Sequence, residues 1–153
     1  MTKTLALIVF MAVILSTAAV ARDGDFGLGV IIGEPTGLSA KAWLSSKSAV
    51  DFAAAWSFEK HAKFHLHADY LMHSFRLIKV EKGELPLYFG VGGRLILREH
   101  DHDDLVGIRI PVGLEYFFDE LPLDVFVEVV PVVNLAPDTD ADMDGGIGIR
   151  YMF

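Results

Sequence analysis

The feature that most constrains this chain is a strict two-residue alternation of apolar with small or polar side chains, seen most clearly in its last nine residues. Ile147, Ile149, Tyr151 and Phe153 occupy every second position there, and glycine, arginine and methionine fill the positions between them. Successive side chains of a β-strand point to opposite faces, so this spacing predicts a strand with one wholly apolar face. A membrane-spanning strand, with aromatic residues at the lipid–water boundary, provides the environment that such a face needs.

The same alternation recurs along the rest of the chain, which predicts an all-β fold. Turn-forming or charged residues separate the alternating segments, and no link suits a helical crossover, so we expect neighbouring strands to pair antiparallel. Backbone amides find no hydrogen-bond partner in a bilayer, so a membrane-spanning sheet must close on itself. We therefore predict an eight-stranded antiparallel transmembrane up-and-down β-barrel, with strands at 26–33, 38–45, 50–58, 63–73, 87–98, 106–118, 123–134 and 145–153.

Three places fit this pattern poorly. Pro111 and Pro131 fall inside predicted strands, where a proline removes one hydrogen bond of the ladder, so we expect a bulge or kink at each. The link 74–84 is long for a turn on the side of the membrane that holds both chain ends, although its apolar residues allow it to extend the flanking strands. The last connection, 136–144, is acidic, and we expect it to be a solvated loop.

The first residues have the layout of a secretory signal peptide. Lys3 precedes an apolar run over 5–15, and small residues follow, ending in Ala19-Val20-Ala21, which is an A-x-A cleavage site. A membrane anchor helix is the alternative, but the run is short for a spanning helix. We expect a cleaved signal peptide at 1–21 and a barrel domain at 22–153.

The composition restricts how the fold is held together and what it binds. The chain has no cysteine, so no disulfide framework is available to an exported protein of this sequence. A net charge of −8 at pH 7 argues against nucleic acid as a partner, because phosphates require basic patches. The mean hydropathy of +0.40 is high for so acidic a chain, and the apolar residues are distributed with a two-residue period.

The chain resembles small eight-stranded outer-membrane barrels of the OmpA and OmpX type, and more closely an uncharacterised family of small bacterial outer-membrane barrels. The likeness covers about 25–153 and is carried by GLGVIIGEPTGLSAKAWLS, HLHADYL, PLYFGVGGR, RIPVGLEYFF, PLDVFVEVVP and GGIGIRYMF. It implies this fold and a location in the outer membrane of a Gram-negative-type cell, and no established reaction comes with it. We expect a monomer with outer-membrane lipid around it and no cofactor. The likeness also implies that Tyr151 and Phe153 form the terminal aromatic signal read by the barrel-assembly machinery. The predicted loops are shorter than those of adhesin-type relatives, which argues against an adhesin.

The polar face of the predicted strands carries charges of both signs. An eight-stranded barrel is only wide enough for side chains to fill its interior, so a continuous pore is not expected. Buried charges must pair, and glycines leave room for long arginines, so we predict an internal salt-bridge network in which Glu115 or Glu128 is the partner of Arg109. The members of this predicted network are Lys41, Asp51, His65, His67, Asp69, Arg94, Arg109, Glu115, Asp124, Glu128 and Arg150.

The apolar face is expected to contact lipid. Residues of this face alternate with small or polar ones on every predicted strand. The positions for which we predict an outward orientation are Leu28, Val50, Phe52, Leu66, Val91, Ile108, Val127 and Ile149.

Two patterns admit a metal-site interpretation. His65, His67 and Asp69 share one face, with neighbours about 7 Å apart, and they would need a further ligand such as a glutamate from the next strand or water. Asp140-x-Asp142-x-Asp144-Gly145 matches the beginning of a calcium-binding loop, but the twelfth position of that loop is Tyr151 and not the required glutamate. We therefore predict polar filling for the first set and a solvated loop for the second.

Two further functions compete with a simple outer-membrane barrel. A lipid-modifying enzyme would use Ser57 with His65 and an acid, but no nucleophile motif marks the serine and the predicted interior leaves little room for substrate. A soluble periplasmic barrel for a small apolar ligand would have the opposite arrangement, with the apolar face inside. We expect a non-enzymatic integral outer-membrane protein with a structural or surface-interaction role and no open pore.

Overall fold

The computed structural model describes residues 25–56, 62–98 and 103–153, and this part of the chain is all-β and antiparallel, as predicted. The predicted signal peptide at 1–21 lies outside the described residues, and so does Ser57. The described part has no helix of the length and hydropathy that a membrane span requires. The strands are β1 (Phe26–Glu34), β2 (Gly37–Trp43), β3 (Ser48–Ala55), β4 (Ala62–Ser74), β5 (Leu87–Arg98), β6 (Leu105–Arg109), β7 (Val112–Phe117), β8 (Leu123–Ala136) and β9 (Asp140–Met152).

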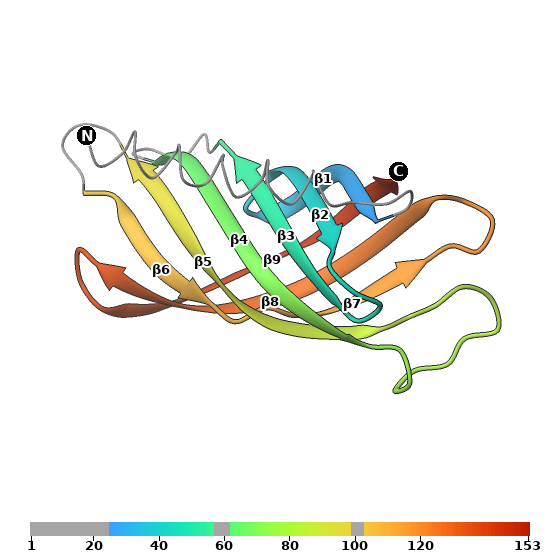
Figure 1. Cartoon of the computed structure of the whole chain (residues 1–153). Helices are drawn as coiled ribbons and strands as arrows, with labels where there is room; N and C mark the ends of the chain where they lie inside the picture. Colours follow the sequence, from blue (N-terminus) through green and yellow to red (C-terminus); the bar gives the residue numbers. More distant parts are fainter. Residues whose placement is uncertain (1–24, 57–61, 99–102) are drawn as a thin grey trace.

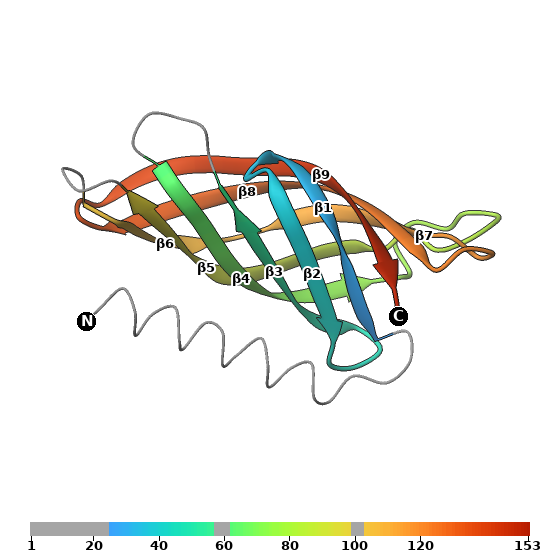
Figure 2. The same ribbon diagram turned by 90° about the horizontal axis from the view of Figure 1, so that it is seen from above.

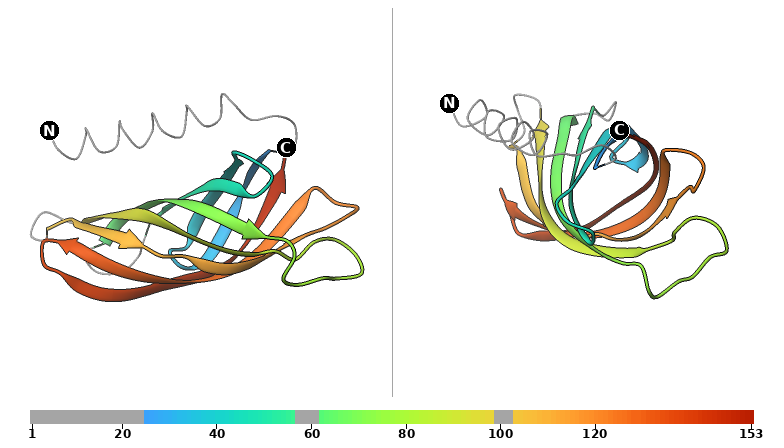
Figure 3. Two further views of the ribbon diagram at one scale, coloured as in Figure 1. Left: turned by 60° about the horizontal axis from the view of Figure 1, so that its bottom comes forward. Right: turned by 45° about the vertical axis from the view of Figure 1, so that its right-hand side comes forward.

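The strand pairings form a continuous ring. Starting from β1, the ladder runs through β2, β3, β4 and β5 in sequence order, and β5 then pairs with both β6 and β7. Both of these short strands pair with β8, which pairs with β9, and β9 returns to β1. Figures 1 and 2 show the long tilted strands of this sheet, and the right-hand view of Figure 3 shows it curving around an enclosed interior.

The strands β6 and β7 are two halves of one predicted strand, interrupted at Pro111. Arg109 pairs with Val132 in β6, and Val112 pairs with Val129 in β7, so the register on β8 is the same on either side of the interruption. The described residues therefore form nine strands where the sequence predicted eight. The cause is the expected one, since proline cannot donate to the ladder.

The second proline behaves differently from the prediction. Pro131 pairs with Met143 inside the uninterrupted β8–β9 ladder, so the expected bulge or kink at this residue was wrong. The carbonyl of Pro131 accepts a hydrogen bond of 2.9 Å from the amide of Ile110, which places the missing donor of Pro131 on the same side, facing the gap between β6 and β7. The ladder to β9 loses nothing because the proline nitrogen points away from it.

The connections also differ from expectation at one point. The strand β9 begins at Asp140, with Asp140 paired to Asn134, so only 137–139 remain as a connection and the predicted acidic loop over 136–144 was wrong. The acidic residues continue the alternation of the terminal strand, and pairing with β8 orders them. The longest described connection, 75–86, lies at the end of the sheet that holds the C-terminus (Figure 1).

The two faces of the sheet differ sharply in chemistry. Of the eight residues expected to face outward, Leu28, Val91, Ile108, Val127 and Ile149 are between 41% and 55% exposed. Val50 is half-buried. Phe52 and Leu66 are next to the inward-facing Asp51 and His67 on their strands, and their side chains are only 4% and 5% exposed.

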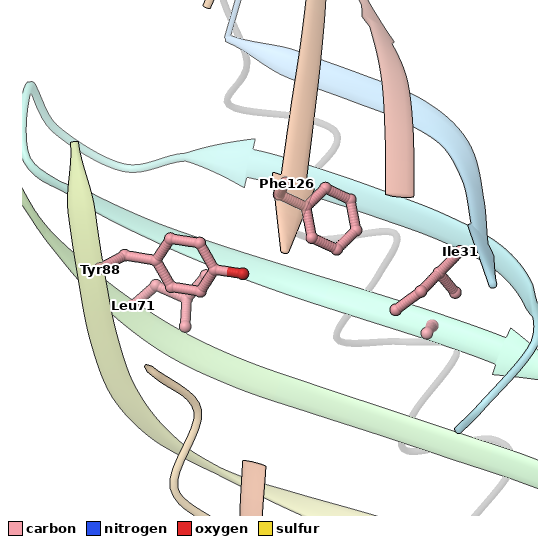
Figure 4. Close-up of a cluster of buried hydrophobic side chains, with 5 residues drawn as sticks. Ile31, Leu71, Tyr88 and Phe126 are labelled. Carbon is pink, nitrogen blue, oxygen red and sulfur yellow. The ribbon is translucent and has the colours of Figure 1, made fainter. Parts of the chain in front are cut away.

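The interior also holds a small apolar cluster, formed by Ile31, Ala53, Leu71, Tyr88 and Phe126. Figure 4 shows its larger side chains approaching one another from strands on different sides of the ring. The remaining buried interior positions of these strands are mostly charged or small.

Candidate functional site: two interior ionic clusters

The residues predicted for the internal network lie inside the closed sheet. His65 is half-buried. The other members have side chains at most 4% exposed: Lys41, Asp51, His67, Asp69, Arg94, Arg109, Glu115, Asp124, Glu128 and Arg150.

The first group, here called the Glu115 cluster, consists of Lys41, His73, Glu115, Asp124 and Arg150. Glu115 accepts hydrogen bonds from Lys41 Nζ and from Arg150 Nη2, the latter at 2.7 Å, and its Oε2 lies 3.1 Å from His73 Nε2. Arg150 Nε also donates to both Asp124 oxygens, at 3.0 and 3.2 Å. Both formal cations of the cluster therefore contact carboxylates that are completely or almost completely buried.

Aromatic rings surround these two cations. Lys41 Nζ lies 4.4 Å from the ring centroid of Trp43, and Arg150 Cζ lies 4.1 Å from that of Phe126. Such cation–π contacts are strongest where water is excluded, as it is at these buried side chains. The aromatic rings therefore contact sides of Lys41 and Arg150 that the two acids do not cover.

The second group, here called the Arg109 cluster, is larger and more acidic. Arg109 Nε donates to both oxygens of Asp69 at 3.0 and 3.1 Å, its Nη1 donates to Asp144 at 2.9 Å, and its Nη2 reaches Glu128 at 3.5 Å. Arg94 donates to the other oxygen of Asp144 at 2.8 Å. The members of the cluster are Asp51, His67, Asp69, Arg94, Arg109, Glu128 and Asp144.

Strand register and glycine explain how the sequence builds these groups. Asp124 lies directly opposite Arg150 in the β8–β9 ladder, so this pair is set by backbone pairing alone. A side chain at Gly92 would collide with the Asp69 carboxylate and with the β4 backbone, and one at Gly148 would collide with the ring of Phe126. These two glycines therefore leave the space that the Asp69 carboxylate and the Phe126 ring occupy.

Tyr88 joins the two clusters through the apolar cluster. Its hydroxyl donates a hydrogen bond of 2.9 Å to Glu128 in the Arg109 cluster, and its ring centroid lies 5.6 Å from Lys41 Nζ in the Glu115 cluster. The ring itself packs in the apolar group shown in Figure 4.

The partners of Arg109 are only partly those expected. Of the two alternatives predicted for Arg109, Glu128 is its partner, whereas Glu115 belongs to the other cluster. The alternation places both glutamates on the inner face but cannot fix the height at which a tilted strand delivers each of them. The position of each glutamate along the axis of the ring depends on the register shifts that add up from strand to strand.

Several network residues were absent from the predicted set. His73, Tyr88 and Asn134 occupy inward positions of predicted strands, so their alternation already indicated them. Asp144 was assigned to a loop, but it continues the inward series of Arg150, two positions at a time. Extending the terminal alternation toward the N-terminus would have found it.

The two metal-site patterns have different outcomes in the structure. The acids of the calcium-like pattern project from β9 and bind protein donors: Asp140 accepts from Asn134 at 2.7 Å, and Asp142 accepts from Arg94 at 2.9 Å. These acids therefore do not form a solvated loop of unoccupied metal ligands. In the histidine pattern, His67 and Asp69 come together with Asp51 from β3, and possible ligand atoms of these three lie within 4.8 Å of one another, without His65.

The predicted assembly residues lie on the outer side. Tyr151 and Phe153 are 48% and 58% exposed, with ring centroids 5.0 Å apart. The amide of Phe153 donates to the carbonyl of Phe26 at 2.7 Å, which ties the last residue to the first strand.

A shallow hollow of about 250 Å³ opens at the same end of the sheet. It has both aromatic and acidic walls. Its lining residues are Asp25, Trp43, Ser45, Ser46, Phe75, Glu84 and Phe117.

Comparisons with known proteins give no relative: no family model matches the chain, and no curated protein or solved structure matches it significantly.

Proposed function

We propose that this protein is an integral outer-membrane β-barrel with a structural or surface-interaction role and no open pore. In this proposal β6 and β7 count as one strand, so that eight strands close the barrel. The observation that carries the proposal is that ion pairs lie inside the ring and large aliphatic side chains outside it, the reverse of the arrangement in soluble proteins.

The outer face supports a lipid environment. Val30, Val91, Val129 and Ile147 are each between 45% and 59% exposed and come from four different strands. Soluble proteins rarely expose continuous apolar surface of more than a few hundred Å². Hydrocarbon removes the cost of such a surface, and a closed ladder satisfies the backbone without water.

The inner face argues against the soluble alternative. A carrier of a small apolar ligand needs an apolar cavity, whereas Lys41, Arg109, Glu115 and Arg150 are no more than 1% exposed inside this sheet. Mutual pairing of these side chains fills the space that a ligand or a stream of ions would need. We therefore assign the ionic interior a structural role and not a catalytic or conducting one.

Aromatic residues at both ends of the strands fit the two boundaries of a bilayer. Trp56 and Phe64 lie at one end with ring centroids 6.4 Å apart, and Phe26, Tyr151 and Phe153 lie at the other. Transmembrane barrels carry such girdles at both interfaces. We propose that Tyr151 and Phe153 present the recognition signal to the barrel-assembly machinery and that the folded monomer is surrounded by outer-membrane lipid.

The connections indicate where a surface interaction would occur. Among the connections that the structure describes in full, 35–36 and 137–139 at the far end are short, whereas 75–86 lies at the end with Asp25 and the C-terminus, close to the hollow lined by Trp43 and Phe117. An even strand count places both ends of the barrel on one side of the membrane. If that side is the periplasm, the longest described connection, 75–86, offers a surface for a partner there.

Membrane fractionation combined with gel mobility tests the proposal. Folded outer-membrane barrels resist SDS until heated, because the closed ladder must be disrupted as a unit. We expect the protein in the outer-membrane fraction, with a band that shifts in mobility on boiling. Recovery in the soluble periplasmic fraction, or a single mobility before and after boiling, would contradict it.

A further inference from the structure

The buried charges of the interior do not balance. Among the described residues, six carboxylates but only four lysine or arginine side chains are buried. Each of the four cations contacts at least one carboxylate: Lys41 binds Glu115, Arg94 binds Asp144, Arg109 binds Asp69, and Arg150 binds Asp124. Two negative charges therefore remain without a protein cation.

The excess is concentrated at Asp51. Every other buried carboxylate of the described residues forms an ion pair with a lysine or arginine, whereas Asp51 forms none with either, and its Oδ1 lacks a hydrogen-bond partner. Backbone register places Asp51 directly opposite Asp69, so two carboxylates face each other on adjacent strands. An arrangement of this kind is unfavourable in a buried site unless something positive joins the two acids.

An imidazole lies beside these two acids. His67 is 2% exposed, its Nε2 lies 3.8 Å from Asp69 Oδ2, and its Nδ1 has no hydrogen-bond partner. His65, the next inward residue of β4, also has a buried Nε2 without a partner. Five buried side-chain atoms of the described residues lack a partner; two belong to arginines that are already paired, and the other three lie together on β3 and β4.

We propose that Asp51, His67 and Asp69 bind one divalent cation of the zinc type inside the sheet. Possible ligand atoms of the three side chains lie within 4.8 Å of one another, and ligands around a zinc ion lie roughly 3–4 Å apart, so a small movement of the side chains closes the site. One imidazole with two carboxylates suits zinc and similar ions better than calcium or magnesium, which take oxygen ligands.

The surrounding residues prepare the site. Both oxygens of Asp69 accept from Arg109 Nε, which fixes the orientation of this ligand in the way that outer-shell hydrogen bonds do at known metal sites. A divalent ion supplies the two positive charges that the described interior lacks. The inference depends on the packing of the interior and not on the membrane in which the protein resides.

Metal analysis of the refolded full chain tests the proposal. The protein is refolded in detergent with and without ZnCl₂, unbound ion is removed by gel filtration, and folding is checked by the heat-dependent gel shift. We expect one zinc per folded molecule and a higher temperature for loss of the SDS-resistant form. Asp51→Asn and His67→Gln should each lower zinc content at least tenfold. Asp51→Asn removes the unpaired charge and should still fold.

Two controls separate this site from others. Asp124→Asn makes the same chemical change in the Glu115 cluster and should retain one zinc. Replacement of His100 and His102 by alanine removes the histidines of the 99–104 segment and should also leave zinc content unchanged. Folded wild-type protein without zinc would overturn the proposal, and so would zinc that persists in both Asp51→Asn and His67→Gln or that disappears with His100 and His102.

Discussion

The two interior clusters use the same residue types but reach different charge balances. In the Glu115 cluster, Lys41 and Arg150 are balanced by two acids, and aromatic rings cover both cations. In the Arg109 cluster, there are four buried acids for two arginines, and the arginines pair with three of them. The first is a complete structural network, whereas the second has an unpaired carboxylate at Asp51.

The difference teaches that burial alone does not distinguish a structural network from a binding site. Charged side chains of both clusters are almost fully buried, and both are held by residues from several strands. The distinguishing observation is whether every charged side chain contacts a side chain of opposite charge inside the protein. A cluster that is complete contributes stability by itself, and one that is incomplete requires an external ligand or proton.

The largest expected effect comes from removing the central cation of the acidic cluster. Arg109→Met leaves Asp69 without its cation and deprives Asp144 of one of its two arginines. We expect a loss of about 3–5 kcal/mol in the free energy of unfolding, measured by reversible unfolding in lipid. Lys41→Met should cost less, about 1–3 kcal/mol, because Glu115 keeps Arg150 and His73.

A double-mutant cycle separates the clusters further. Arg109→Met combined with Asp69→Asn should recover part of the loss, since the stranded carboxylate is removed as well. Arg109→Met combined with Glu115→Gln should be additive within about 0.5 kcal/mol, because these residues share no direct contact. Equal coupling of Arg109 to Asp69 and to Glu115 would show that the interior is a single network.

A charge on the outer face should weaken both clusters together. Val127 is 46% exposed and lies between inward-facing Phe126, which contacts Arg150 of the Glu115 cluster, and Glu128, which contacts Arg109. Val127→Arg should cost about 2–4 kcal/mol if the residue lies near the bilayer midplane. Fluorescence of single-tryptophan variants that retain Trp43 or Trp56 should report the same change in the free energy of unfolding at both ends of the sheet.

The control for this prediction is Lys47→Ala, in an exposed turn, which should change stability by no more than about 0.5 kcal/mol. Similar small effects of Val127→Arg and Lys47→Ala would argue against lipid at Val127. A shift seen only at Trp43 or only at Trp56 would mean that the two ends unfold independently.

Replacement of a buried aspartate by asparagine should change the free energy of unfolding in opposite directions in the two clusters. Asp124→Asn weakens the paired acceptor of Arg150 and should cost about 1–3 kcal/mol. Asp51→Asn removes a carboxylate that has no cation and should raise stability by about 1 kcal/mol in buffer with EDTA. A loss of stability in Asp51→Asn as large as that in Asp124→Asn would remove the distinction between the clusters.

Effects of about the same size come from the glycines that leave room for each cluster. Gly92→Ala intrudes on Asp69, and Gly148→Ala intrudes on Phe126 beneath Arg150, so each should cost about 1–2 kcal/mol. Gly93→Ala meets only the carbonyl of Gly107 at 3.6 Å and should be neutral. Zinc content should fall in Gly92→Ala and remain in Gly148→Ala, because only the first change disturbs a proposed ligand.

The sequence predicted the strands and the faces better than the contacts. Alternation identified the antiparallel strands and the inward position of Arg109 and Glu115, because a strand fixes the face of every residue. It could not assign these two residues to different clusters, since strand tilt and register set their relative height. The same limit hid Asp51 as a neighbour of Asp69, which only the β3–β4 register brings opposite.

The absence of cysteine from the chain allows the central claim to be tested residue by residue on one strand. Single cysteines are placed on β8 at Val127, Val129 and Val133, which are exposed, and at Val130 and Val132, which are buried. Nitroxide labels on the reconstituted protein are then probed with oxygen, which enters lipid, and with a water-soluble nickel complex. The account predicts strong collision with oxygen and weak collision with nickel at the first three positions, and weak collision with both reagents at the other two. Nickel access to Val127 and Val129 equal to that of oxygen would contradict a lipid-facing outer surface.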